Sequence, residues 1–128
     1  MKKLIVLSAA FFSFNALAHI DCLVGDYTNA QGKKVFSVTE QHHSGILTNT
    51  QTGEQITLNV MKEKQILSLW KQMHWATRSA QDAECGADKK IKNVVCEISN
   101  ADVEPKFNHS SNIYLNEMNE LILVSHKD

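Results

Sequence analysis

Short segments of β-type composition, separated by glycines, fill residues 25–60 and constrain the fold of this chain more than any other feature. Four such segments occur there, at 26–29, 35–39, 46–50 and 56–60. The last of them alternates apolar and polar side chains, as a half-buried strand does. Residues 51–54 (Gln-Thr-Gly-Glu) have the composition of a hairpin loop. The pattern predicts an antiparallel meander of four strands with one buried face.

The following stretch, residues 61–85, differs in kind because it contains no glycine or proline and many good helix formers. Ile66, Trp70, Met73 and Thr77 recur at helical spacing, and Gly86 stands where a helix C-cap is expected. These signals favour a helix over about residues 66–84. A period of two also fits part of the segment, so the alternative is a fifth strand followed by a loop.

The β pattern returns after Gly86. Residues 91–99 read as a strand, and residues 113–115 and 121–124 read as a closing hairpin around the loop 116–120. The last strand is apolar on both faces, so we expect it inside the sheet or under a helix. The predicted fold class is therefore α+β: an antiparallel β-meander curled toward a small barrel, with one helix.

One stretch carries a resemblance to a known family. Gly25-Asp26-Tyr27-Thr28-Asn29, with Gly32, Gly45 and Gly53 following, resembles the opening of small lipocalin-like barrels. In those barrels a Gly-x-aromatic starts the first strand and later glycines mark the hairpins. The resemblance covers about the first 40 residues that follow residue 18. It implies a curled meander and suggests an all-β lipocalin-like barrel as the alternative fold.

The first eighteen residues have the pattern of a signal peptide. Lys2 and Lys3 form a positive n-region, residues 4–14 are almost entirely apolar, and Ala16-Leu17-Ala18 supplies the small residues that a signal peptidase reads. We expect cleavage after Ala18, leaving residues 19–128 as a single β-rich domain in the periplasm or outside the cell. Loss of the two lysines shifts the formal net charge from −1 to −3. No later apolar stretch approaches the ~20 residues of a membrane span, so none is expected.

Three cysteines follow the predicted cleavage site, namely Cys22, Cys85 and Cys96. In an oxidising compartment this number predicts one disulfide and one remaining thiol. The favoured pair is Cys85–Cys96, which closes a short loop around the turn at 86–90 and would stabilise the fold by about 3 kcal/mol. A bridge from Cys22 to either of the other two cysteines is the alternative.

The chain lacks diagnostic catalytic or metal-binding motifs. It has no Gly-x-Ser-x-Gly elbow and no histidine or cysteine pair at zinc-site spacing. We therefore expect a protein that is not an enzyme and uses no metal or cofactor. His19 is the exception to consider, because a mature N-terminal histidine could chelate copper through its α-amino group and imidazole. Arg78 is the only arginine and no basic patch stands out, so nucleic acid is not an expected partner.

Recognition-type side chains concentrate between residues 70 and 78. We predict a partner-binding surface there, formed by Trp70, His74, Trp75 and Arg78. Tryptophan and arginine are enriched among interface hot spots. The first functional hypothesis is a non-catalytic binding protein that contacts a protein partner in the cell envelope or outside the cell, such as a hydrolase inhibitor or a toxin-immunity protein. The alternative is a small-molecule or copper binder that uses a β-barrel cavity or the His19 site.

Overall fold

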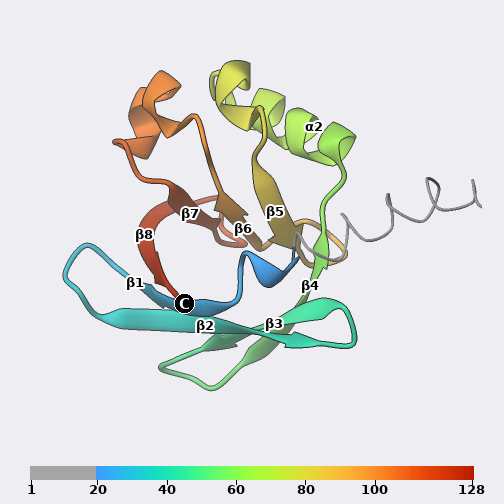
Figure 1. The fold of residues 1–128 in the computed structure, drawn as a ribbon, viewed down its shortest axis with the longest axis vertical. Coiled ribbons are helices and arrows are strands. Elements are labelled where there is room, and N and C mark those ends of the chain that lie inside the picture. Colours follow the sequence, from blue (N-terminus) through green and yellow to red (C-terminus); the bar gives the residue numbers. More distant parts are fainter. Residues whose placement is uncertain (1–19) are drawn as a thin grey trace, which may run out of the picture.

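The computed structural model describes residues 20–128, which form a closed barrel of eight antiparallel strands (Figure 1). Each strand pairs with the next along the chain, and the last pairs with the first. The strands are β1 (Gly25–Thr28), β2 (Lys34–Gln41), β3 (Ser44–Asn49), β4 (Gln55–Val60), β5 (Glu84–Ala87), β6 (Val94–Glu97), β7 (Asn112–Leu115) and β8 (Leu121–Lys127). The predicted curled meander with a small barrel and a helix is confirmed. The predicted signal peptide and His19 lie outside the described residues.

The glycine-separated region forms β1 to β4 in the predicted order. In β2 the side chains alternate, with Phe36 and Val38 buried and Lys34 and Thr39 exposed. Residues 50–54 connect β3 to β4, and Gly53 adopts the positive φ (77°) that such a loop needs. The glycine-separated segments of β-type composition therefore form the predicted strands, and their inner face is the packed one.

The helix is shorter than predicted. Helix α2 spans Glu63–Met73, whereas the expectation was about 66–84. It ends because His74 adopts a left-handed conformation (φ 60°) and the Trp75 amide then donates to the Trp70 carbonyl. This reversal packs Trp75 edge-on against Trp70, with ring centroids 5.0 Å apart. Tertiary packing, and not a glycine or proline, ends the helix.

The segment after α2 also departs from the expectation. The short 3-10 helix η1 spans Thr77–Ala80, and strand β5 follows it. Gly86 lies inside β5, so its interpretation as a helix C-cap was wrong. A Cβ at this position would lie 3.2 Å from the Leu23 side chain, which shows that the glycine makes room for the N-terminal segment.

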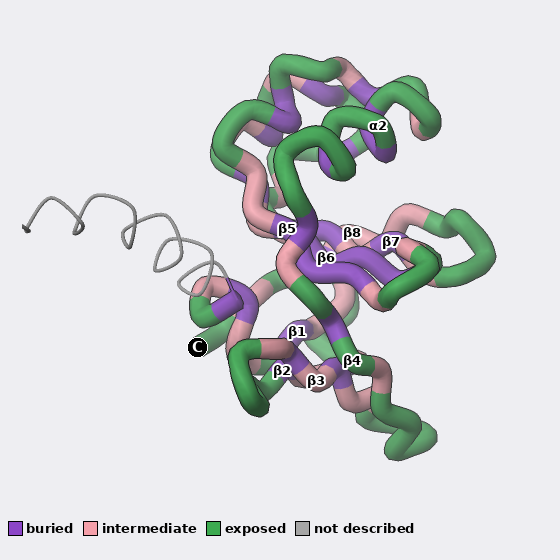
Figure 2. Tube along the Cα trace, turned by 90° about the vertical axis from the view of Figure 1, so that its right-hand side faces the viewer, coloured by how far each residue is buried: buried purple, intermediate pink, exposed green. Residues whose placement is uncertain are grey.

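Strands β5 and β6 are buried over most of their length, whereas β7 and β8 are partly buried (Figure 2). Their outer face packs against α2, η1 and the 3-10 helices η2 (Ala101–Val103) and η3 (Pro105–Phe107). In β8, Leu121 and Leu123 contact this helical layer, whereas Ile122 and Val124 contact the barrel interior. The expectation that the last strand lies under a helix is confirmed. One hydrophobic core thus lies between the helices and the outer face of the barrel, and a second hydrophobic core lies inside the barrel.

The disulfide joins Cys85 and Cys96, as predicted. These residues lie directly opposite each other on β5 and β6, and both are buried under the helical layer. The alternatives that paired Cys22 with either cysteine are therefore wrong. The bridge links two neighbouring strands at the centre of the covered half of the barrel.

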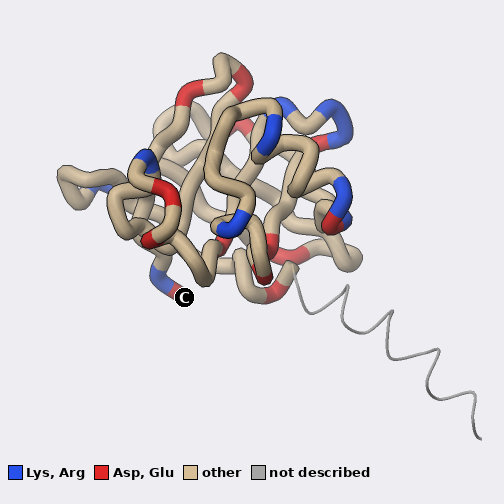
Figure 3. The backbone as a smooth tube through the Cα atoms, turned by 90° about the horizontal axis from the view of Figure 1, so that it is seen from above, with Lys and Arg blue, Asp and Glu red and all other residues tan. Residues whose placement is uncertain are grey.

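The surface of the described residues carries charges of both signs. In Figure 3, segments with Lys or Arg and segments with Asp or Glu lie at several places around the molecule. Among residues 20–128, no helix is long and apolar enough to cross a membrane.

Candidate functional site: the open end of the barrel

The two ends of the barrel differ because the N-terminal segment fills one of them. Ile20 and Leu23 are fully buried and belong to the core inside the barrel. The inward positions of two strands carry glycine where this segment packs: the nearest atoms to a Cβ at Gly45 or Gly86 would include Ile20 or Leu23 side chains, at 3.2–3.3 Å. This end is therefore a closed end, and a ligand has no room there.

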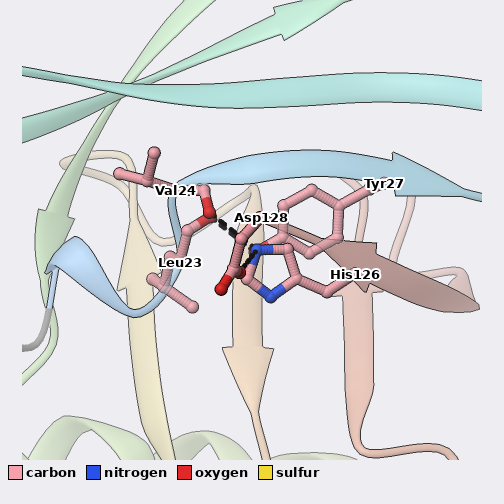
Figure 4. Close-up of polar contacts among 5 residues, drawn as sticks. All are labelled: Leu23, Val24, Tyr27, His126 and Asp128. Carbon is pink, nitrogen blue, oxygen red and sulfur yellow. Dashed lines mark hydrogen bonds and ion pairs between the residues drawn. The ribbon is translucent and has the colours of Figure 1, made fainter.

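Polar contacts fasten the closed end (Figure 4). The Tyr27 hydroxyl donates to the Leu23 carbonyl at 2.6 Å, and His126 Nε2 donates to the Val24 carbonyl at 2.7 Å. The two rings stack with centroids 4.5 Å apart. Gly25 has a φ of 143°, and a Cβ there would lie 2.4 Å from the Lys127 carbonyl oxygen. These contacts join the start of β1 to the end of β8, so we assign this cluster a structural role.

Cys22 lies beside two carboxylates near the same end. One ligating atom from each of Cys22, Glu84 and Glu97 lies within 4.8 Å of the others. Burial first, and then the charges of Glu84 and Glu97, raise the pKa of the Cys22 thiol to about 12. A thiol with that pKa stays protonated at neutral pH, and the thiolate is the form that attacks carbon or binds metal. The arrangement therefore favours a neutral thiol that is hydrogen-bonded to Glu84.

The opposite end of the barrel holds a cavity of about 350 Å³. Its apolar lining comes from β2, β3, β4, β7 and β8 and consists of Val35, Phe36, Leu47, Ile56, Tyr114 and Ile122. Polar side chains of the surrounding loops and strand ends complete it: Asn49, Gln51, Glu54, Asn93, Asn116 and Glu117. A concave site that combines apolar and aromatic side chains with polar groups has the composition of a small-molecule site. We therefore take this open end as the candidate functional site.

Two asparagines shape the loops around the cavity. Asn49 Oδ1 accepts hydrogen bonds from the Gln51 and Thr52 amides at the end of β3. Asn116 Oδ1 accepts from the Met118 and Glu120 amides at the end of β7. Such side-chain bonds to the backbone two to four residues on are typical of asparagine in turns. Both hairpin loops at the rim are thus held by their own hydrogen bonds.

Tyr114 is a polar residue of the cavity lining that is hydrogen-bonded to a second lining residue, Asn93. It is half-buried, and its hydroxyl donates to Asn93 Oδ1 at 2.8 Å. Burial first, then the charges of Glu117, Asp88 and Glu54, raise the pKa of Tyr114. The hydroxyl therefore stays protonated at neutral pH and gives its one proton to Asn93.

The residues that the sequence predicted as a partner-binding surface separate into two groups. Trp70 and Trp75 are buried and pack edge-on around Phe107, and Trp70 Nε1 donates to Ser79 Oγ at 2.7 Å. Their rings supply core packing, so they do not offer the exposed contact area that the hypothesis assumed. His74 and Arg78 are exposed. Partner binding through these two residues stays a prediction.

Sequence reasoning offered a β-barrel cavity as an alternative binding site but did not locate it, although the six apolar strand residues that line the open-end cavity all lie in predicted strands. Their convergence depends on barrel closure, which brings β2 and β8 together across 86 residues of chain from Phe36 to Ile122. The available signal was Asn49 and Asn116, which lie near the end of the predicted strand 46–50 and directly after the predicted strand 113–115. No protein-family model, no curated protein and no solved structure matches this chain.

Proposed function

We propose that this chain is an exported, non-catalytic binding protein that holds one small, largely apolar molecule in the open end of its barrel. The observation that supports this function is the 350 Å³ cavity with its apolar floor and polar rim. An eight-stranded barrel is just wide enough to be filled by its own side chains or to hold one small ligand. Here Ile20 and Leu23 pack into the interior core at one end of the barrel, and the cavity lies at the other end.

An exposed methionine at the entrance supports the same function. Met118, in the β7–β8 loop, is 77% exposed and lines the cavity. A flexible thioether side chain adapts to apolar surfaces of different shape, and methionine is common at adaptable binding sites. Covering it with a bound molecule would remove the most exposed large apolar side chain of the described residues from water.

Export follows from the predicted signal peptide, and the disulfide is compatible with an oxidising compartment. The copper alternative depends on His19, which the structure does not describe, and it stays a prediction. The cavity supports the small-molecule hypothesis more directly than any surface feature supports a protein partner. Binding is the role proposed, because the lining residues that could act as bases, Glu54 and Glu117, have no serine, cysteine or histidine in the same lining to act as a nucleophile.

The test is binding of the neutral apolar fluorophore N-phenyl-1-naphthylamine. Ile56→Trp would fill the cavity from β4, whereas Thr57→Trp places the same ring at the neighbouring exposed position of that strand. We expect saturable fluorescence enhancement with the unmodified protein and with Thr57→Trp, and loss of it with Ile56→Trp. Circular dichroism and thermal melting would verify that both variants fold. Absence of saturable binding to the unmodified protein, or unchanged binding to a folded Ile56→Trp variant, would contradict the proposal.

A further inference from the structure

The charges around the open-end cavity are of one sign. Glu54, in the β3–β4 loop, and Glu117, in the β7–β8 loop, both line it, and none of the lining residues is a lysine, arginine or histidine. Both carboxylates act on the Tyr114 hydroxyl strongly enough to help raise its pKa, as does Asp88. A concave site lined by charges of one sign concentrates counter-ions of the other sign. The cavity is therefore suited to a cation.

The nearest lysines along the chain do not cancel these charges within the cavity. Lys34 precedes the lining residue Val35, but its Nζ lies 3.0 Å from Asp26 Oδ1 and is paired there. Lys92 precedes Asn93, and its side chain is exposed and does not line the cavity. The carboxylates of Glu54 and Glu117 therefore make the electrostatic potential in the cavity negative.

The hydrogen-bonding capacity of Tyr114 also favours a ligand that donates hydrogen bonds. The Tyr114 hydroxyl has one proton and donates it to Asn93 Oδ1, so its remaining capacity is to accept. Carboxylates also only accept when they are ionised. A ligand that donates through N–H groups matches these acceptors, whereas a ligand carboxylate would depend on the amide N–H groups of Asn49, Gln51, Asn93 and Asn116 and would be repelled by the charges of Glu54 and Glu117.

We infer that the molecule bound at the open end is an organic cation, with an apolar body against Phe36, Leu47 and Ile122 and a protonated amine near Glu54, Glu117 and Tyr114. This inference rests on the proposed function and narrows its ligand class. The Phe36 and Tyr114 rings, whose centroids lie 5.0 Å apart, give the apolar body an aromatic wall. The cavity volume lies at the low end of the range for small-molecule sites, which suits a compact, single-headed molecule.

Three probes of one size and shape test the charge preference: 4-phenylbutylamine, 4-phenylbutan-1-ol and 4-phenylbutyrate. Their dissociation constants would be measured at low ionic strength by nuclear magnetic resonance titration of the cavity residues. We expect the amine to bind roughly three- to tenfold more tightly than the alcohol, since exposed charges interact weakly, and the carboxylate to bind more weakly still. Salt should reduce the preference for the amine and leave the alcohol unaffected.

A charge-neutral double variant, E54Q/E117Q, separates the carboxylates from the shape of the cavity. We expect it to bind the amine and the alcohol almost equally, with alcohol binding as in the unmodified protein. E63Q removes an exposed carboxylate from the first turn of α2, away from the cavity lining, and serves as the control that keeps the amine preference. If the alcohol binds in the cavity but the amine is not preferred, or if E54Q/E117Q retains the preference, the inference is overturned and the proposed function stands. If none of the three probes binds, both are overturned.

Discussion

At the scale of single residues, Cys22 and Gly25 show how tightly the closed end is packed. Gly25 has a positive φ and no space for a Cβ beside Lys127 and His126, so a glycine is required on both grounds. Cys22, three residues earlier, is partly buried beside two carboxylates. Each residue is explained by its neighbours across the barrel and not by its neighbours in sequence.

The raised pKa of Cys22 predicts a pH-dependent stability. Because the folded-state pKa is about 12 against an ordinary value of 9.0, the folded protein binds this proton more tightly than the unfolded chain does. The stabilisation is fully present below about pH 9 and is lost as the pH rises toward 12. Urea unfolding from pH 8 to pH 11 should show a decline in the free energy of unfolding that is smaller in Cys22→Ala.

The same shift predicts slow alkylation of the native thiol. At pH 8 the thiolate fraction should be several hundredfold or more below that of an ordinary cysteine, and iodoacetamide should modify Cys22 correspondingly slowly until the protein is unfolded. A native Cys22 that reacts as fast as the denatured chain would contradict the neutral, hydrogen-bonded thiol.

At the scale of elements, α2 and the segment after it show why tryptophan and arginine in one stretch serve different purposes. The reversal at His74 turns Trp75 back onto Trp70 and leaves Arg78 at the surface. Helix α2 and the 3-10 helices η1, η2 and η3 then cover the outer face of β5 to β8. An interface interpretation built on residue types alone could not distinguish these positions.

This division predicts opposite effects of two substitutions. Trp75→Ala removes a 4% exposed ring from the helix-side core and should cost about 3–5 kcal/mol of stability. Arg78→Ala changes an exposed residue and should alter stability by less than about 0.5 kcal/mol. Thermal and urea unfolding of both variants measure this difference. If a protein partner does bind here, Arg78→Ala would weaken its capture from envelope extract at an unchanged melting temperature. Equal destabilisation by both substitutions would contradict the packing described for Trp75.

At the scale of the whole molecule, the barrel has one closed and one open end because residues 20–24 enter it beside β1. The predicted cleavage after Ala18 would leave this segment intact in the mature chain. Ile20 and Leu23 are essentially unexposed, so a cleavage site only a few residues further on would remove side chains from the core. Chain processing and barrel architecture are therefore linked.

We expect N-terminal sequencing of the exported protein to begin at His19, and thiol titration after denaturation to find one thiol per chain. Replacing Ala16 and Ala18 with leucine removes the small residues that the peptidase reads and should leave the precursor uncleaved. A mature chain that begins after Leu23 would contradict both the cleavage site and the closed end, and three titratable thiols in the native-purified protein would contradict the Cys85–Cys96 disulfide.

The sequence by itself determined the local elements of this protein. Segments of β-type composition between glycines predicted β1 to β4, the apolar character of residues 121–124 predicted that β8 is covered by other elements, and the cysteine spacing favoured the Cys85–Cys96 bridge. These features are readable because each depends on residues close together in the chain: a strand with one packed face must alternate, and a short loop between two cysteines favours their pairing. The helix formers around residue 66 likewise predicted a helix where α2 lies, but they did not predict where α2 ends.

Only the tertiary structure decided where α2 stops, that Gly86 belongs to a strand and that the tryptophans are buried. The end of α2 depends on contacts between Trp70, Trp75 and Phe107, which are separated by up to 37 residues of chain. The open-end cavity has the same origin, because its walls come from five strands that meet only when β8 pairs with β1. Long-range packing, which no local pattern encodes, therefore positions the candidate site of this protein.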